Sequence, residues 1–178
     1  MSIISMDTYV GDSFVRWDAY KHSDNVISRF SSEEWHKIAS DVYNEEELDS
    51  LFTLYSDRIQ GFVLYENKTS STIAFVYLLN ESKKEKVVSF HGGGWGKSPR
   101  LSLLYMRGAI LLIDYILKAG FKVRTYCTLD NSNAYKFMHG LGFVRYCTTN
   151  ERIYQWVNLH RLHNSKIYKY IFKKDFII

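Results

Sequence analysis

The sequence predicts an α/β protein of the α+β type, with a mixed, mostly antiparallel twisted sheet and helices on both faces. Runs of β-branched and aromatic residues separated by short polar turns indicate hairpins on either side of the middle of the chain. Between them, the order strand, glycine-rich loop, long helix and strand implies a right-handed crossover and one parallel pair. The chain has 178 residues and no Pro-rich or Gly/Ser-rich linker, so we expect a single domain over 1–178.

The N-terminal third predicts one strand and two helices. Residues 12–20 have the composition of an early strand. A helix is expected from Ser31 or Ser32, because Ser31 and Glu34 have the spacing of a capping box. This helix is expected to run to about Tyr43, and a second helix to cover 45–56.

The next segment predicts a hairpin and then a third strand. Residues 61–66 and 72–79 are the two strands of the hairpin, and the polar residues 67–71 form its turn. Residues 86–91 are the third strand, which leads into a glycine-rich loop over 92–99.

A long buried helix is expected after this loop. Ser98 is a good N-cap, Pro99 a good first helical residue, and Gly120 a good C-terminal cap. The helix is apolar nearly all round, which indicates burial. The remaining expected elements are a strand over 122–129, a helix over 133–141 and a second hairpin over 143–149 and 152–160. In the tail, 161–178, basic and aromatic residues alternate, and this favours an amphipathic strand packed on the body over a nucleic-acid-binding segment.

The net charge of +4 conceals an asymmetry. Residues 1–60 hold 12 acidic and 5 basic groups, whereas residues 61–178 hold 7 acidic and 18 basic groups. The basic part suits an anionic ligand, a nucleic acid or solubility alone.

The cysteines and the hydropathy pattern bear on localisation. Two cysteines, Cys127 and Cys147, form neither a disulfide framework nor a four-ligand zinc site, so we expect two buried thiols in a reduced cytoplasmic protein and no metal. The longest apolar stretch, 101–117, contains Arg107 and Asp114, and no signal peptide is visible, so no membrane association is expected.

The glycine-rich loop resembles a nucleotide-binding loop in part. Gly96-Lys97-Ser98 matches the end of a P-loop, but His91 stands where the first glycine belongs. A P-loop-like nucleotide-binding protein is therefore an alternative. It is less favoured than the interpretation that rests on residues 131–143.

The segment after the last expected crossover strand resembles a known family. Asn131, Ala134, Gly142 and Phe143 have the spacing of the last conserved motif of the GNAT superfamily, the acyl-CoA-dependent N-acyltransferases. Met138 stands where that motif has a tyrosine. The order of elements over about 61–160 also resembles the coenzyme-binding half of this family.

The resemblance implies an acyl-CoA-dependent N-acetyltransferase that passes acetyl directly from acetyl-CoA (coenzyme A) to a primary amine. It implies that 61–160 form the coenzyme-binding core and that 1–60 form much of the acceptor side. The acidic balance of 1–60 suggests a cationic acceptor, either a small molecule such as a polyamine or aminoglycoside, or a lysine in a peptide. No nucleic acid is expected as a partner, and a homodimer is left open.

The resemblance also places the cofactor. Arg100 matches the first residue of a second family signature, but Leu103 and Tyr105 fill its two small positions. A second register uses residues 94–98 as the pyrophosphate cradle. The residues assigned to the cofactor are Phe90, Lys97, Ser98, Arg100, Leu101, Ser102, Asn131 and Lys136.

Two residues are assigned to catalysis. His91 ends the strand beside the expected thioester channel and is the first choice as general base for the amine. Methionine cannot donate a proton, so Tyr135 is the substitute acid for Met138, with Tyr126 and Cys127 as others. A non-catalytic coenzyme A binder remains the principal alternative, because Met138 and the lost glycines depart from the family pattern.

Overall fold

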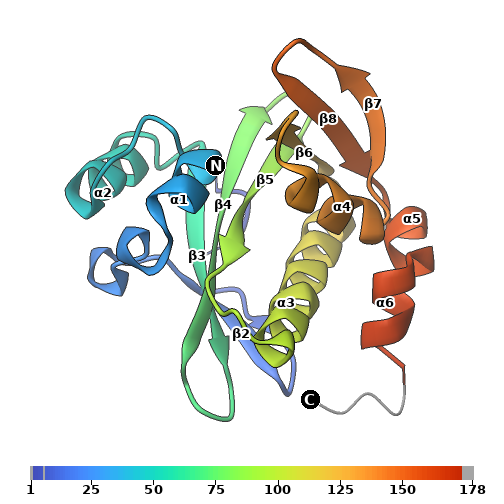
Figure 1. Ribbon diagram of the computed structural model, residues 1–178, viewed down its shortest axis with the longest axis horizontal. Helices are drawn as coiled ribbons and strands as arrows, with labels where there is room; N and C mark the ends of the chain where they lie inside the picture. Colours follow the sequence, from blue (N-terminus) through green and yellow to red (C-terminus); the bar gives the residue numbers. More distant parts are fainter. Residues whose placement is uncertain (1, 6, 174–178) are drawn as a thin grey trace.

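A computed structural model, which describes residues 2–5 and 7–173, contains one eight-stranded sheet in the order β1-β2-β3-β4-β5-β6-β8-β7 (Figure 1). The strands are β1 (Val10–Gly11), β2 (Val15–Ala19), β3 (Ile59–Glu66), β4 (Thr72–Ser82), β5 (Val87–Gly94), β6 (Lys122–Thr128), β7 (Val144–Thr148) and β8 (Arg152–Val157). The helices are η1 (His22–Asp24), η2 (Ile27–Arg29), α1 (Ser32–Ile38), α2 (Glu45–Leu54), α3 (Pro99–Lys118), α4 (Ser132–Gly140), α5 (Leu159–Asn164) and α6 (Lys166–Ile171).

The predicted sheet type is confirmed. Every neighbouring pair of strands is antiparallel except β5 and β6, which are parallel and joined through α3. The hairpins β3–β4 and β7–β8 lie on either side of this crossover, as the turn residues predicted. In Figure 1 the β7–β8 hairpin extends at the upper right, above α5 and α6.

Helices cover both faces of the sheet. Neighbouring residues along each strand point to opposite sides, so both faces carry apolar side chains that pack against helices. On one face, Val63 and Phe75 pack with Trp35 of α1 and Leu48 of α2. On the other face, the alternate residues of the same strands pack with the apolar surface of α3, where Ile110 is fully buried. A site that opens between two strands of this sheet is therefore bordered by α1 and α2 on one face and by α3 on the other.

The start of α1 follows the predicted capping. Ser31 accepts from the Glu34 N–H at 3.2 Å, while the Glu34 carboxylate accepts from the Ser31 N–H at 2.9 Å. Helix α1 nevertheless ends at Ile38, five residues before the predicted Tyr43. The Trp35 indole N–H donates to the Val42 carbonyl at 2.7 Å, and this side-chain bond holds the chain in a turn after the helix.

The glycine-rich segment departs from the prediction of a loop. Gly92, Gly93 and Gly94 continue β5, where they pair with Val76, Phe75 and Ala74 of the long strand β4. Local composition favours a loop here, but β4 offers a complete row of partners and extends the strand. Only residues 95–98 form the connection to α3.

Two further expectations are wrong. The tail forms two short helices, α5 and α6, instead of a strand. Ile167 and Ile171 of α6, four residues apart, both pack in the α3 core, and this spacing suits a helix. The last five residues of the tail lie outside the described residues. Cys147 is exposed on the edge strand β7, whereas Cys127 is buried as expected.

Within residues 2–5 and 7–173, none of the helices has the length and apolar character that a membrane crossing requires.

Two neighbouring glycines of β5 give a matched test of this register. Gly92 has a φ of +148°, and a Cβ there would lie 2.2 Å from the Phe75 carbonyl oxygen. A Cβ on Gly93 would meet nothing closer than 3.6 Å. We expect Gly92→Ala to lower the free energy of unfolding by about 2 kcal/mol or more, and Gly93→Ala to leave it nearly unchanged. Urea unfolding of both variants checks this, and equal effects would show that the register is wrong.

Candidate active site

The two parallel strands separate soon after they meet. β5 and β6 pair only over three residues, Val87–Ser89 against 122–124. Just beyond, the Thr125 hydroxyl donates to the Phe90 carbonyl at 2.9 Å, a buried side-chain bond that replaces the next ladder bond. From there β5 continues along β4 and β6 along β8, so an opening forms between them.

Peptide groups of β5 face this opening. The Phe90 carbonyl points toward β6, whereas the Trp95 N–H donates to Ile73 on the β4 side at 3.1 Å. Because peptide groups alternate along a strand, the N–H groups of Gly92 and Gly94 point toward the opening. These two donors lack a ladder partner there and are available to a ligand carbonyl.

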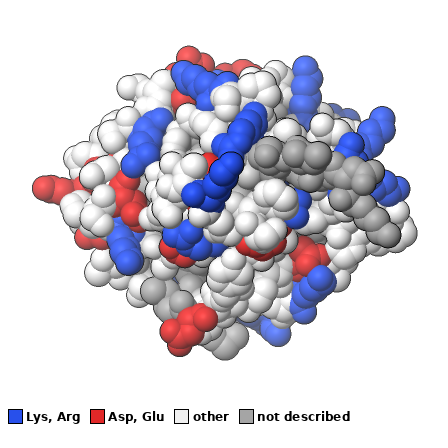
Figure 2. Space-filling view, turned by 90° about the horizontal axis from the view of Figure 1, so that it is seen from below, with Lys and Arg blue, Asp and Glu red and all other residues white. Residues whose placement is uncertain are grey.

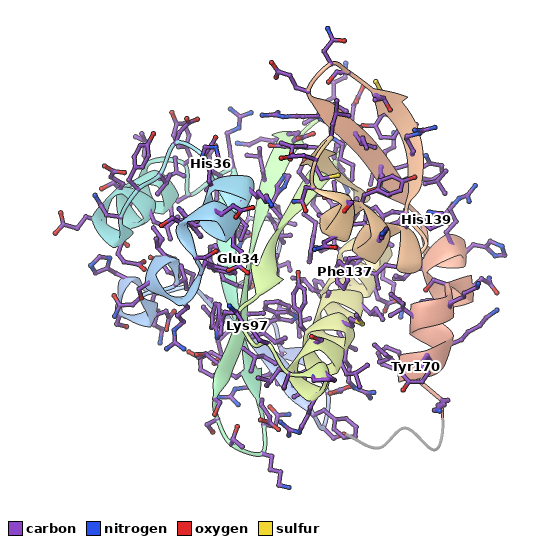
Figure 3. The ribbon with its side chains drawn as sticks, viewed as in Figure 1. Glu34, His36, Lys97, Phe137, His139 and Tyr170 are labelled. Atoms are coloured by element: carbon purple, nitrogen blue, oxygen red, sulfur yellow. The ribbon has the colours of Figure 1, made fainter. Side chains whose placement is uncertain are left out.

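The opening is a cleft of about 320 Å³. Its walls come from the end of β5 (90–94), from β6 (125–127), from α1 and from the helices α3 and α4. Figure 3 shows Glu34 of α1 and Phe137 of α4 on opposite sides of the end of β5, with Lys97 below Glu34. His139 lies on the outer side of α4 and takes no part in the wall.

His91 lies in the cleft wall and is buried. Its ring stacks on Tyr77 at 5.1 Å and meets the edge of Tyr126 at 4.5 Å. The imidazole Nε2 is buried and has no hydrogen-bond partner among the described residues. Burial, aided by the positive charge of Arg152, lowers the pKa of His91 to about 4, so the ring is neutral at physiological pH. A neutral, unpartnered imidazole can accept a proton from a bound group.

The lowered pKa of His91 has a consequence for stability. Between pH about 6.5 and 4 the unfolded chain binds a proton at this histidine that the folded chain does not, so stability falls as the pH falls. We expect the wild type to lose about 2–3 kcal/mol more than His91→Gln between pH 7 and 4.5. Urea unfolding at both pH values measures this difference, and parallel losses would place His91 in solvent.

The three proton donors predicted for the leaving thiol are placed differently. Tyr126 and Cys127 line the cleft. Burial raises the pKa of the Cys127 thiol, which keeps it protonated and a poor nucleophile. Tyr135 is not part of the cleft wall, and its ring stacks on His139 at 6.1 Å. The structure thus brings His91 together with Tyr126 and Cys127, and leaves Tyr135 outside.

The connection between β5 and α3 retains free backbone donors. Among the described residues, no hydrogen bond engages the N–H groups of Gly96, Lys97, Ser98 or Arg100. The Ser98 hydroxyl accepts from the Leu101 N–H at 3.2 Å and caps α3, and Lys97 is exposed beside it. This arrangement supports the second predicted register, in which the loop itself holds an anion.

Arg100 has a different environment from the one its motif suggests. Its guanidinium pairs with Glu66, whose side chain is only 4% exposed and also accepts from the Thr69 hydroxyl at 2.8 Å. A buried carboxylate needs such a partner, so Arg100 has a structural task in this chain.

The other predicted cofactor residues divide between the cleft and its surroundings. Asn131 lines the cleft, and its side-chain amide oxygen Oδ1 caps α4 by accepting from the Ala134 N–H at 3.2 Å. Phe90 also lines it. Leu101 packs against the α3 core, and Ser102 and Lys136 are exposed outside the wall.

Tyr105 and Phe137 form a contact in the cleft wall that sequence reasoning missed. Their rings stack at 5.3 Å with an angle of 11°, and both line the cleft, one from α3 and one from α4. Tyr105 also packs against Gly94, where a Cβ would lie 3.2 Å from the ring. The sequence showed only that Tyr105 stands at a position where the family has a small residue; its partner lies 32 residues further along.

The fold is similar to those of solved acyltransferases. A GCN5-related N-acetyltransferase from Brucella melitensis superposes with a TM-score of 0.68 at 11% identity, over 92% of this chain and 83% of that one. The spermidine N-acetyltransferase from Vibrio cholerae, solved with CoA and spermine, gives 0.65 at 14% identity, over 86% and 100%. Apo FdhC, a nucleotide-linked sugar GNAT, gives 0.66 at 12%, over 87% and 92%.

No family model and no curated protein sequence matches this chain. The likeness therefore rests on structure, and it shows that the chain has the fold of the GNAT superfamily.

Proposed function

We propose that this protein is an acyl-CoA-dependent N-acetyltransferase, which transfers acetyl from acetyl-CoA directly to a primary amine. The observation that carries the proposal is the parting of β5 from β6, which opens a cleft lined with free N–H groups beside a neutral histidine. The fold, shared with acetyltransferases, agrees with it.

The residues present fit acetyl-CoA at its reactive end. The Gly92 and Gly94 N–H groups face the opening and would hold the carbonyl groups of the thioester arm. The free N–H groups of 96–98 and the exposed Lys97 would hold the pyrophosphate. When bound, the cosubstrate supplies the activated acetyl group.

The side chains of the cleft would manage the protons. Transfer forms a C–N bond and breaks a C–S bond, so the amine must lose a proton and the departing sulfur must gain one. His91 Nε2 accepts the first proton, since it is neutral, buried and unpartnered. Tyr126 and Cys127, which carry dissociable protons in the wall, are the donors for the sulfur. The protonated state of Cys127 favours direct transfer over an acyl-cysteine route.

A second function is favoured by one specific observation. The Tyr105–Phe137 stack places a large aromatic side chain in the cleft wall at a position where the family has a small residue. A non-catalytic coenzyme A binder would combine this stack with Met138 in place of a tyrosine. It predicts coenzyme A binding with no transfer to any amine.

A thermal-shift comparison of acetyl-CoA, free CoA and Mg-ATP tests the class of ligand. A ligand at one hundred times its dissociation constant adds about 2.7 kcal/mol, which is about 5–10 °C for a chain of this size. We expect a shift with both coenzyme A forms and none with Mg-ATP. A shift with Mg-ATP alone would replace the proposal by the P-loop alternative, and acetyl-CoA binding without transfer to any amine would favour the non-catalytic binder.

The loop register is tested by a pair of lysines at opposite ends of β5. We expect Lys97→Ala to weaken acetyl-CoA binding by about tenfold, because one charge-assisted phosphate contact is lost. Lys84→Ala removes the same charge from the exposed turn before β5 and is expected to leave the affinity unchanged. Isothermal titration calorimetry measures both affinities, and equal effects would mean that Lys97 acts only through net charge. Arg100→Ala is unsuitable here, because it would leave Glu66 buried without a partner.

A further inference from the structure

Arg152, the first residue of β8, is a cation placed beside the proposed base. Its guanidinium carbon lies 4.5 Å from the centroid of the Tyr126 ring. The Tyr126 ring lies in turn 4.5 Å from the His91 ring, and Tyr126 lines the cleft. The charge of Arg152 is therefore felt at His91, where it helps to lower the pKa of the imidazole.

Arg152 has no acidic partner among the described residues. Within the part of the chain that the structure describes, no carboxylate lies within ion-pair distance of Arg152, which is half-buried. Two cations on elements that line the cleft are paired: Lys37 of α1 pairs with Glu33 at 3.0 Å, and Arg124 of β6 pairs with Glu81. A half-buried arginine fork without a carboxylate is suited to an incoming anion.

Several acidic side chains of the N-terminal third bind backbone N–H groups of their own segment. Glu45 and Glu47 at the start of α2 accept from the backbone N–H groups of Ile27 at 2.6 Å and Tyr43 at 2.8 Å. In Figure 2 some acidic side chains lie at the left edge, the side on which α2 lies in Figure 1, and others are spread over the same face. The one carboxylate in the cleft wall, Glu34, is held by the capping box of α1. The bulk acidity of 1–60 thus does not describe the cleft.

We propose that the acceptor is an amine that carries an anionic group, a carboxylate or a phosphate, a few bonds from the nitrogen, and that Arg152 selects it. This inference rests on the proposed acetyl transfer and names its acceptor class. The amine lies at His91 Nε2, and the anionic group meets the guanidinium of Arg152 past the Tyr126 ring. A cationic polyamine is disfavoured, because its second charge would lie against Arg152.

Matched pairs of acceptors test this class. The pairs are ethanolamine phosphate with ethanolamine, glucosamine 6-phosphate with glucosamine, and β-alanine with its amide, and spermidine represents the polyamines. Release of free thiol from acetyl-CoA reports the rate. We expect the anionic member of at least one pair to have a kcat/KM at least about tenfold higher than its neutral partner and than spermidine. The phosphate and carboxylate pairs distinguish the two anions.

Variants assign the selection to Arg152. Arg152→Gln should raise KM for the anionic member to the level of the neutral one with little change in kcat, and Arg152→Lys should restore part of the difference. Arg145→Gln, on the exposed neighbouring strand β7, is the matched control and should leave all rates unchanged. Acetyl-CoA affinity and melting temperature, measured for each variant, should equal those of the wild type.

The failures of the two proposals are distinguishable. If the wild type does not bind acetyl-CoA, the proposed function is wrong. If it binds acetyl-CoA but prefers spermidine or the neutral amines, the inference about the acceptor is wrong. The inference is also wrong if no anionic amine is acetylated and none raises the melting temperature of the acetyl-CoA complex more than its neutral partner does. It is equally wrong if Arg152→Gln leaves the preference for the anionic amine intact.

Discussion

The early parting of β5 from β6 is the constraint on which the rest of the site depends. A parallel pair would normally continue its ladder, but here it stops after three residue pairs and ends at the bond between Thr125 and the Phe90 carbonyl. Each strand keeps its other neighbour, β4 or β8, so the sheet remains continuous while a gap opens inside it. Unpaired peptide groups in such a gap need water or a ligand.

The two faces of the sheet divide the chemistry between them. On the α1 side lie His91, Tyr126 and Arg152, which would receive the acceptor amine. On the α3 and α4 side lie Tyr105 and Phe137, and the loop after β5 ends at the start of α3. In the proposed function, one cleft between two strands would place two reactants on opposite sides of a shared edge. Positioning of this kind supplies much of the rate enhancement in acyl transfer.

Local patterns in the sequence were sufficient for most elements of the fold. Strand periodicity and cap residues located β3, β4, α3 and α4 to within a few residues, and the crossover rule gave the parallel pair. The errors arose where contacts outside the element decide: β4 extends β5 through its glycines, and a bond from the Trp35 indole to the Val42 carbonyl holds the turn that follows α1. The tail was misassigned because alternation in a basic segment also fits short amphipathic helices.

The types of residue in the site could be predicted from the sequence, but the contacts between residues far apart in the sequence could not. His91 is in the cleft, but the sequence could not show that Tyr135 points away from it. The pairing of Arg100 with Glu66, 34 residues apart, is a property of the folded chain. So is the absence, among the described residues, of a carboxylate within ion-pair distance of Arg152. Charge summed over the first 60 residues does not show where those side chains point, so it could not indicate which of them line the cleft.

Hydrogen–deuterium exchange with and without acetyl-CoA tests the central claim most directly, since that claim concerns backbone N–H groups that face the gap. Binding is predicted to slow exchange at Gly92 and Gly94 and at residues 96–98, while the β1–β2 ladder and the β7–β8 hairpin remain unchanged. Protection confined to other segments, or none at a saturating concentration, would contradict the account.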